Sequence, residues 1–186
     1  DAADHRLYAG SPSAGTIYAV DVAADAPRGA VHLASVGSPN GLTMGPDGAL
    51  YYSDFSATGH VYRVVAGART QVTTPTIDEP NGVAFHRDGS LYVDSYGTGS
   101  LLRLTLAGDV ETGRSTVATG LGSPDGLAFD ASGRIYIGDD LGGRLIRLDA
   151  DGSHPEILLR GVPAAANVAF GAGALPCTDI YVASEG

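Results

Sequence analysis

Short apolar runs separated by Gly-containing turns recur along the whole chain, a pattern typical of strands. In each repeat, an apolar run is followed by a tight turn and then by a run rich in β-branched residues and Tyr. These pairs are 42–44 with 50–52, 83–85 with 91–93, 127–129 with 135–137, and 168–170 with 180–182. A third run, at 61–64, 102–104 and 145–148, alternates apolar residues with Arg or Thr, and a weaker fourth lies at 70–74, 116–119 and 157–159. No segment predicts a helix of three turns.

The repeating unit opens with a Pro-Asn/Asp-Gly step. The step occurs at Pro39-Asn40-Gly41, Pro80-Asn81-Gly82 and Pro124-Asp125-Gly126, and a fourth copy keeps only Asn167. Successive Asn or Asp positions are 41, 44 and 42 residues apart. Four antiparallel strands in a unit of this length match one blade of a β-propeller better than any helical repeat. The sequence therefore predicts an all-β propeller of the six-bladed type.

The two ends of the chain predict partial blades. Runs at 6–9, 16–20 and 31–36 match the second, third and fourth strands of a first blade, and the last copy stops after its second strand. Three full and two partial blades are fewer than a closed ring needs, since six blades of this size require roughly 250 residues. We expect residues 1–186 to be one propeller domain, incomplete at both ends, that closes with a missing segment or a second chain.

The composition argues against several classes of function. A formal net charge of −10 argues against nucleic acid as a partner, because phosphates are bound by Lys and Arg. The single Cys177 allows neither an internal disulfide nor a Cys-based metal cluster. No apolar run approaches ~18 residues, so no membrane-spanning helix is predicted. The sequence shows no signal peptide, yet the chain begins at Asp1 and not at Met, so we expect an upstream segment to be missing. The expected soluble protein can therefore be cytoplasmic or secreted/periplasmic.

The repeated Asn and Asp residues predict a ring of oxygen ligands, because each occupies the same place in its unit. Amide and carboxylate oxygens suit hard cations such as Ca²⁺ or Mg²⁺ better than Zn²⁺. The alternative is that Asn and Asp before Gly are only turn formers that tolerate a left-handed backbone.

The steps Pro-Asn-Gly-Leu, Gly-Pro-Asp-Gly-x-Leu-Tyr and Pro-Asp-Gly-Leu-Ala-Phe resemble the gluconolactonase/regucalcin (senescence marker protein) family, and the likeness covers about residues 5 to 184. The family forms six-bladed propellers with a divalent cation, usually calcium, near the central channel. The resemblance implies that Asn81 and Asp125 are metal ligands and that Asp125 is also the catalytic base. It places Asn40 in a substrate-contacting or additional ligand position, and Asn167 in the same pocket.

The sequence departs from that family in two ways. The family's Glu ligand would precede the stretch that matches Asp4 to Tyr8, where this sequence begins. The spacing before Asn40 allows one blade where the family has two. Glu185-Gly186 is similar to the missing step, but it follows a second strand, so we do not assign it as a replacement.

Together these features predict a metal-dependent hydrolase of lactones or related cyclic esters. The alternative is a non-catalytic propeller of the NHL type that binds a sugar or a protein. Asp54, Asp94 and Asp139 are interpreted as structural acceptors at the ends of second strands, with Asp94 and Asp140 as additional candidates for the pocket rim. The five histidines are scattered and predict no metal pair.

Overall fold

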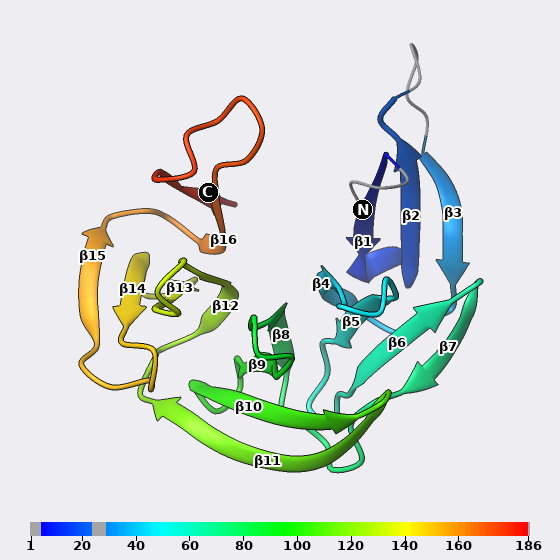
Figure 1. The fold of residues 1–186 in the computed structure, drawn as a ribbon, viewed down its shortest axis with the longest axis horizontal. Coiled ribbons are helices and arrows are strands. Elements are labelled where there is room, and N and C mark those ends of the chain that lie inside the picture. Colours follow the sequence, from blue (N-terminus) through cyan, green and yellow to red (C-terminus); the bar gives the residue numbers. More distant parts are fainter. Residues whose placement is uncertain (1–4, 24–28, 186) are drawn as a thin grey trace.

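The computed structural model of the chain describes residues 5–23 and 29–185, which form five antiparallel sheets arranged in an arc (Figure 1). The first sheet contains β1 (Arg6–Ser11), β2 (Thr16–Asp21) and β3 (Gly29–Ala34). The second contains β4 (Pro39–Met44), β5 (Leu50–Asp54), β6 (Val61–Val65) and β7 (Ala68–Gln71). The third contains β8 (Pro80–Phe85), β9 (Leu91–Ser95), β10 (Ser100–Ala107) and β11 (Val110–Thr119). The fourth contains β12 (Pro124–Phe129), β13 (Ile135–Asp139), β14 (Arg144–Leu148) and β15 (Glu156–Arg160), and the fifth contains β16 (Ala165–Phe170) and β17 (Ile180–Ser184).

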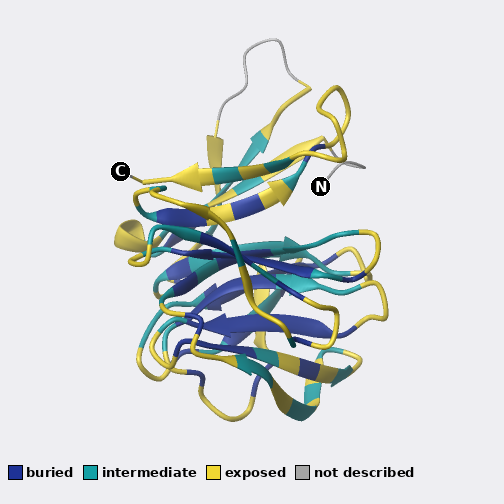
Figure 2. Ribbon diagram, turned by 90° about the vertical axis from the view of Figure 1, so that its left-hand side faces the viewer, coloured by how far each residue is buried: buried dark blue, intermediate teal, exposed yellow. Residues whose placement is uncertain are grey.

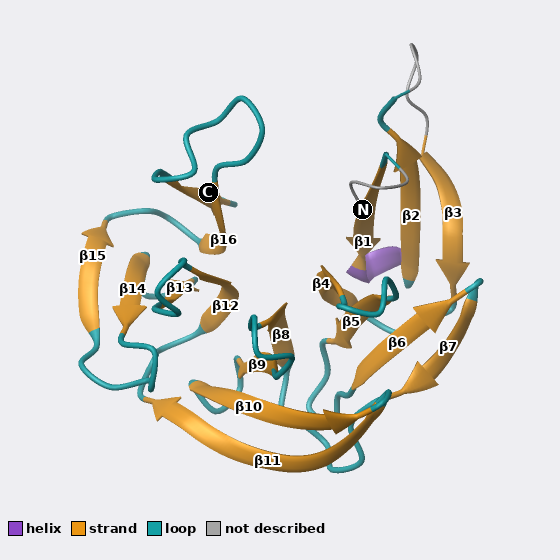
Figure 3. Ribbon diagram, in the orientation of Figure 1, coloured by secondary structure: helices purple, strands orange, loops and turns teal. Residues whose placement is uncertain are grey.

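This arrangement confirms the predicted all-β propeller, with its three four-stranded blades and a partial blade at each end. Figure 3 shows one helical segment in the described part of the chain, the 3₁₀ turn η1 (Pro12–Ala14). Within residues 5–23 and 29–185, no helix is long and apolar enough to cross a membrane. Asp4 and Gly186, which the family resemblance touches, lie outside the described residues.

The core lies between neighbouring blades, where the sheet faces pack on one another (Figure 2). A Tyr on the second strand of one blade repeatedly meets a Phe on the innermost strand of the next, edge to face. The ring centroids are 4.8 Å apart for Tyr51 and Phe85, and 4.9 Å for Tyr92 and Phe129. Because this geometry suits the aromatic quadrupole, the repeated Tyr and Phe positions set how one blade stacks on the next.

The Asn/Asp-Gly steps lie inside strands and are not turns. Each innermost strand shifts register at this step, between Pro39 and Leu42 in β4 and between Pro80 and Val83 in β8. The corresponding shifts in β12 and β16 follow Pro124 and Ala165. None of the four Asn or Asp residues is among the described residues with positive φ. The alternative of turn formers in a left-handed backbone is therefore wrong, and the step is a β-bulge, a feature that re-aims side chains.

The glycine of each bulge is required by close contact between blades. A Cβ on Gly41 would stand 2.2 Å from the main-chain oxygen of Asn81, and a Cβ on Gly82 would stand 2.2 Å from that of Asp125. Only a residue without a side chain lets neighbouring innermost strands approach this closely.

We predict that Gly41→Ala lowers the free energy of unfolding by about 1–3 kcal/mol, because the blades must separate to admit the methyl group. Gly113→Ala is the matched control, since a Cβ there meets nothing closer than 3.8 Å. Urea unfolding of both variants measures the difference. Equal stability of the two variants would contradict the proposed packing.

Candidate functional site

The innermost strands β4, β8, β12 and β16 surround a central cavity of about 350 Å³. Three of the four predicted site residues line it, namely Asn40, Asp125 and Asn167. The other lining residues come mainly from the bulges and the residues that follow them: Tyr8, Gly41, Leu42, Thr43, Gly82, Val83, Ala84, Gly126, Leu127 and Val168. The structure thus brings together residues that are far apart in the sequence.

Asn81 lies outside the cavity lining and is only 2% exposed. Its side-chain oxygen Oδ1 is buried and has no hydrogen-bond partner. A buried oxygen without a partner is costly and rare, so this atom is a candidate ligand for a bound group. Asn167 differs, because its Oδ1 accepts a hydrogen bond of 2.8 Å from the backbone N–H of Val168.

The carboxylate of Asp125 lies in the cavity wall, and no described residue donates a hydrogen bond to it. Burial raises the pKa of Asp125, and the nearby carboxylates of Asp140 and Glu185 raise it further, to about 7. A carboxylate with a pKa near neutrality is suited to accept a proton at physiological pH.

Four residues share one place in their blades, directly after the second strand: Phe55, Tyr96, Asp140 and Glu185. The backbone N–H of each donates to the segment that leads into the innermost strand, at 2.8 to 3.1 Å. The Phe55 and Tyr96 rings lie 5.5 Å apart, and Tyr96 Oη donates to Asp140 Oδ2 at 2.9 Å. Tyr96, Asp140 and Glu185 also lie close enough to Asp125 to interact with it electrostatically.

Of these four residues, the sequence pointed only to Asp140 as a candidate for the pocket rim, and the cavity lining does not include it. Phe55, Tyr96 and Asp140 each stand 15 residues after the Asn or Asp of their blade, and this spacing was the signal that could have identified them. Because the residue type at this position changes from blade to blade, a comparison of residue identities between the repeats does not reveal it.

Asp54 and Asp139 are structural acceptors, as predicted. Asp54 Oδ1 accepts from the Ser38 N–H at 2.7 Å, and Asp139 Oδ1 accepts from the Ser123 N–H at 2.9 Å. Each carboxylate therefore holds the loop that enters an innermost strand. Asp94 is a structural acceptor as well, since its Oδ1 accepts from the Gly82 N–H at 2.8 Å. Because Asp94 is 0% exposed, it does not lie at the pocket rim.

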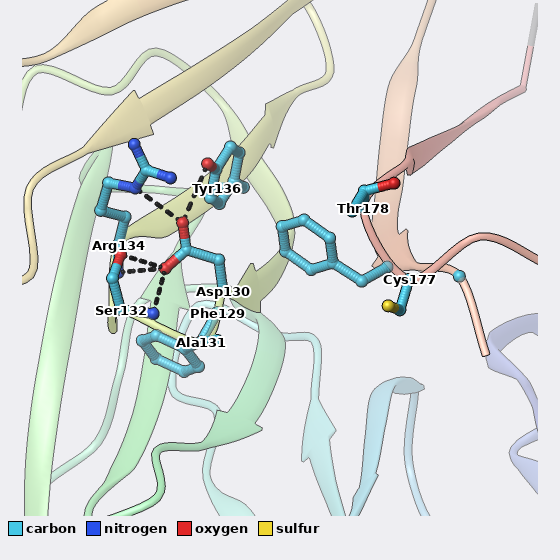
Figure 4. A pocket seen from close by; sticks show the side chains of 10 residues that line it. Phe129, Asp130, Ala131, Ser132, Arg134, Tyr136, Cys177 and Thr178 are labelled. Atoms are coloured by element: carbon cyan, nitrogen blue, oxygen red, sulfur yellow. Dashed lines mark hydrogen bonds and ion pairs between the residues drawn. The ribbon is translucent and has the colours of Figure 1, made fainter.

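A second cavity of about 480 Å³ lies at the opposite end of β12 (Figure 4). Its carboxylate, Asp130, accepts hydrogen bonds from Ser132, Arg134 and Tyr136. Because these groups already form hydrogen bonds with one another, few polar groups in this cavity are free to bind a ligand. The exposed thiol of Cys177 lies at its edge.

A cation such as Ca²⁺ needs several oxygen ligands that converge on one point. Within the described residues, no three His, Cys, Asp or Glu side chains converge on one point. Two oxygen groups without protein hydrogen bonds are available as ligands. Asn81 Oδ1 lacks a partner, and the Asp125 carboxylate receives no hydrogen bond from the described residues. Two such oxygens have the chemistry that Ca²⁺ or Mg²⁺ prefers.

Fold and site together define a β-propeller with amide and carboxylate groups around its channel. The chain matches the SMP-30/gluconolactonase/LRE-like region over residues 54–185, and it belongs to this family. The sequence resemblance to the gluconolactonase/regucalcin family is thereby confirmed. None of the curated proteins matches the sequence significantly.

Solved structures share the fold. A gluconolactonase from Xanthomonas campestris is 21% identical with a TM-score of 0.77, and the match covers 98% of this chain and 66% of that one. The calcium-binding protein regucalcin from Agrobacterium tumefaciens is 25% identical with a TM-score of 0.72, covering 90% and 61%. Virginiamycin B lyase from Staphylococcus aureus is 17% identical with a TM-score of 0.69, covering 97% and 59%. The chain thus spans about two thirds or less of the length of these relatives.

The electrostatics of Asp125 predict how the metal-free protein responds to pH. The folded pKa, about 7, lies above the ordinary value of 3.8. The stability that Asp125 contributes is therefore fully present below pH 3.8 and is lost as the pH rises to about 7. In the presence of a chelator, the melting temperature of the wild type should fall between pH 5 and pH 8, and Asp125→Asn should fall less. Parallel melting curves for the two proteins would refute this electrostatic account.

Proposed function

We propose that the central cavity is the active site of a metal-dependent hydrolase acting on lactones or related cyclic esters. Two observations on the contacting strands β8 and β12 carry the proposal. The Asp125 carboxylate in the cavity wall accepts no hydrogen bond from the described residues, and the buried Oδ1 of Asn81 has no hydrogen-bond partner. Membership of the SMP-30/gluconolactonase/LRE-like family supports it, as do the relatives described as a gluconolactonase and as a calcium-binding protein.

Asn81 and Asp125 would hold the cation, Ca²⁺ or another divalent ion such as Mg²⁺. A divalent cation in such a site polarises an ester carbonyl and lowers the pKa of water. The protein's own contribution is the Asp125 carboxylate, which takes a proton from the attacking water. The water oxygen bonds to the carbonyl carbon, the ring C–O bond breaks, and the departing oxygen gains a proton, which leaves an open-chain hydroxy acid.

Asn40 and Asn167 are proposed to contact the substrate, since both line the cavity beside Asp125. The cavity of about 350 Å³ is large enough for a small ring. The partner is therefore a small-molecule lactone, including sugar-derived ones.

The fold does not by itself select a hydrolase, because virginiamycin B lyase shares it. The competing hypothesis is a non-catalytic, NHL-like propeller that binds a sugar or a protein. The two differ in what they require of position 125, since only a catalyst needs a carboxylate there.

We predict that Asp125→Asn lowers kcat for a δ-lactone by about 10²-fold or more, because the general base is lost. Chelation of divalent cations should abolish turnover, and added Ca²⁺ or Mg²⁺ should restore it. Asp151→Asn is the matched control, since Asp151 is an exposed turn residue bonded to Ser153. Full turnover in the presence of chelator, or by Asp125→Asn, would eliminate this mechanism.

For Asn40→Ala we expect a different kinetic change. Loss of a substrate contact that is made equally in the ground and transition states raises KM with little change in kcat. Steady-state kinetics on the same lactone measure the two constants. A fall in kcat with KM unchanged would contradict a role in substrate binding and indicate that Asn40 acts in the catalytic step.

A further inference from the structure

A serine hydroxyl connects two of the innermost strands at their bulges. Ser53, in β5, stands 13 positions after Asn40 and is 0% exposed. Its Oγ accepts a hydrogen bond of 2.9 Å from the Gly41 N–H in β4. The same hydroxyl donates at 2.5 Å to the main-chain oxygen of Asn81 in β8. One buried side chain therefore bonds to the backbone of two neighbouring blades.

The two bonded groups belong to bulges that carry proposed site residues. Gly41 follows Asn40, which lines the cavity. Asn81 is the residue whose buried Oδ1 has no hydrogen-bond partner. The main-chain oxygen of Asn81 also lies close to Gly41, because a Cβ there would stand 2.2 Å from it. Ser53 thus holds the backbone of a proposed cation ligand against the backbone beside a proposed substrate contact.

The same place in the next two blades is filled differently. Asp94 and Gly138 each stand 13 positions after the Asn or Asp of their blade. Asp94 accepts from the Gly82 N–H of its own blade at 2.8 Å. Gly138 has no side chain, and a Cβ there would stand 2.3 Å from the main-chain oxygen of Ala165 in the next blade. Blades therefore stack at Gly138 without a side chain between them, so stacking as such does not require a hydroxyl at this place.

We propose that Ser53 is a positioning residue for the central site. By bonding to both bulges at once, its hydroxyl fixes the main chain of Asn81 relative to that of Asn40, and it thereby sets where the Asn81 amide oxygen lies. This inference rests on the proposed function, in which Asn81 holds the cation and Asn40 contacts the substrate. Hydrogen bonds behind a ligand orient it, and their loss commonly weakens metal binding by about 10- to 100-fold.

The bridge needs one atom that both accepts and donates. A serine hydroxyl does both, since its oxygen has lone pairs and carries one proton. Alanine at position 53 would leave the Gly41 N–H without this acceptor and the Asn81 main-chain oxygen without this donor. The two bulges would then be free to shift relative to each other, although no residue that lines the cavity had been changed.

Ser53→Ala removes the bridge, and Ser100→Ala is the matched control. Ser100 is also a buried serine, 7% exposed, but it lies in the third strand of its blade, and its hydroxyl bonds to that of Thr98 at 2.7 Å. Calorimetric titration with Ca²⁺ should show affinity about 10-fold weaker in Ser53→Ala and unchanged in Ser100→Ala. Equal affinity in the wild type and Ser53→Ala would overturn the positioning role. An equal loss in both variants would overturn it too, because any buried serine would then have the same effect.

A second variant covers the case in which Ser53→Ala does not fold. Ser53→Cys fills nearly the same space, but a thiol is only a weak donor and a weak acceptor. Its Ca²⁺ affinity should be about 3-fold weaker or more, in proportion to the weakened bridge. Wild-type affinity in Ser53→Cys would overturn the positioning role.

Hydrogen exchange measured by NMR gives a readout that needs no metal. The Gly41 amide should be protected in the wild type, as amides paired within a sheet are, because it donates to Ser53. Its exchange should become about 10-fold faster in Ser53→Ala and stay unchanged in Ser100→Ala. An unprotected Gly41 amide in the wild type would overturn the bridge itself.

The two measurements separate this inference from the proposed function. If the wild type binds Ca²⁺ and Ser53→Ala binds it equally well, the proposed function stands and the positioning role fails. If the wild type binds no Ca²⁺, the proposed function fails and the positioning role fails with it. Exchange of the Gly41 amide then still decides whether Ser53 joins the two blades.

Discussion

The structure depends on the close approach of innermost strands at the glycine of each bulge. A Cβ at Gly41, Gly82 or Gly126 would lie 2.2 Å from an atom of the next blade. This contact brings residues about forty positions apart into one cavity wall. Away from the cavity, the edge-to-face Tyr and Phe pairs stack the blades on one another. The packing between blades therefore sets the geometry of the site.

Burial and neighbouring carboxylates determine the electrostatics of the site. Asp125 is held among Asp140 and Glu185 in a partly buried wall, and the cost of crowding negative charges appears as its raised pKa. Asp94 lies deeper and is fully buried. A site that destabilises its own carboxylates is suited to bind a cation or a proton, since either one relieves the repulsion.

Most of the fold could be predicted because periodicity, turn glycines and β-branched runs make the repeat visible in the sequence. Three features of the site could not. The bulge at Asn81-Gly82 looks like a turn in sequence, since Asn-Gly is a common turn pair, and only strand register distinguishes them. The position directly after the second strand changes from Phe55 to Asp140 between blades, so a comparison of residue identities does not reveal it. The burial of Asp94 follows from blade stacking, which local sequence does not encode.

The central claim is that Asn81 and Asp125 share one cation at the channel. It is tested most directly by a crystal structure of the protein grown with Mn²⁺, whose anomalous scattering locates the ion. The account predicts one channel peak about 2–2.6 Å from both Asn81 Oδ1 and an Asp125 carboxylate oxygen. A channel without a peak, or a peak that touches neither residue, would contradict it.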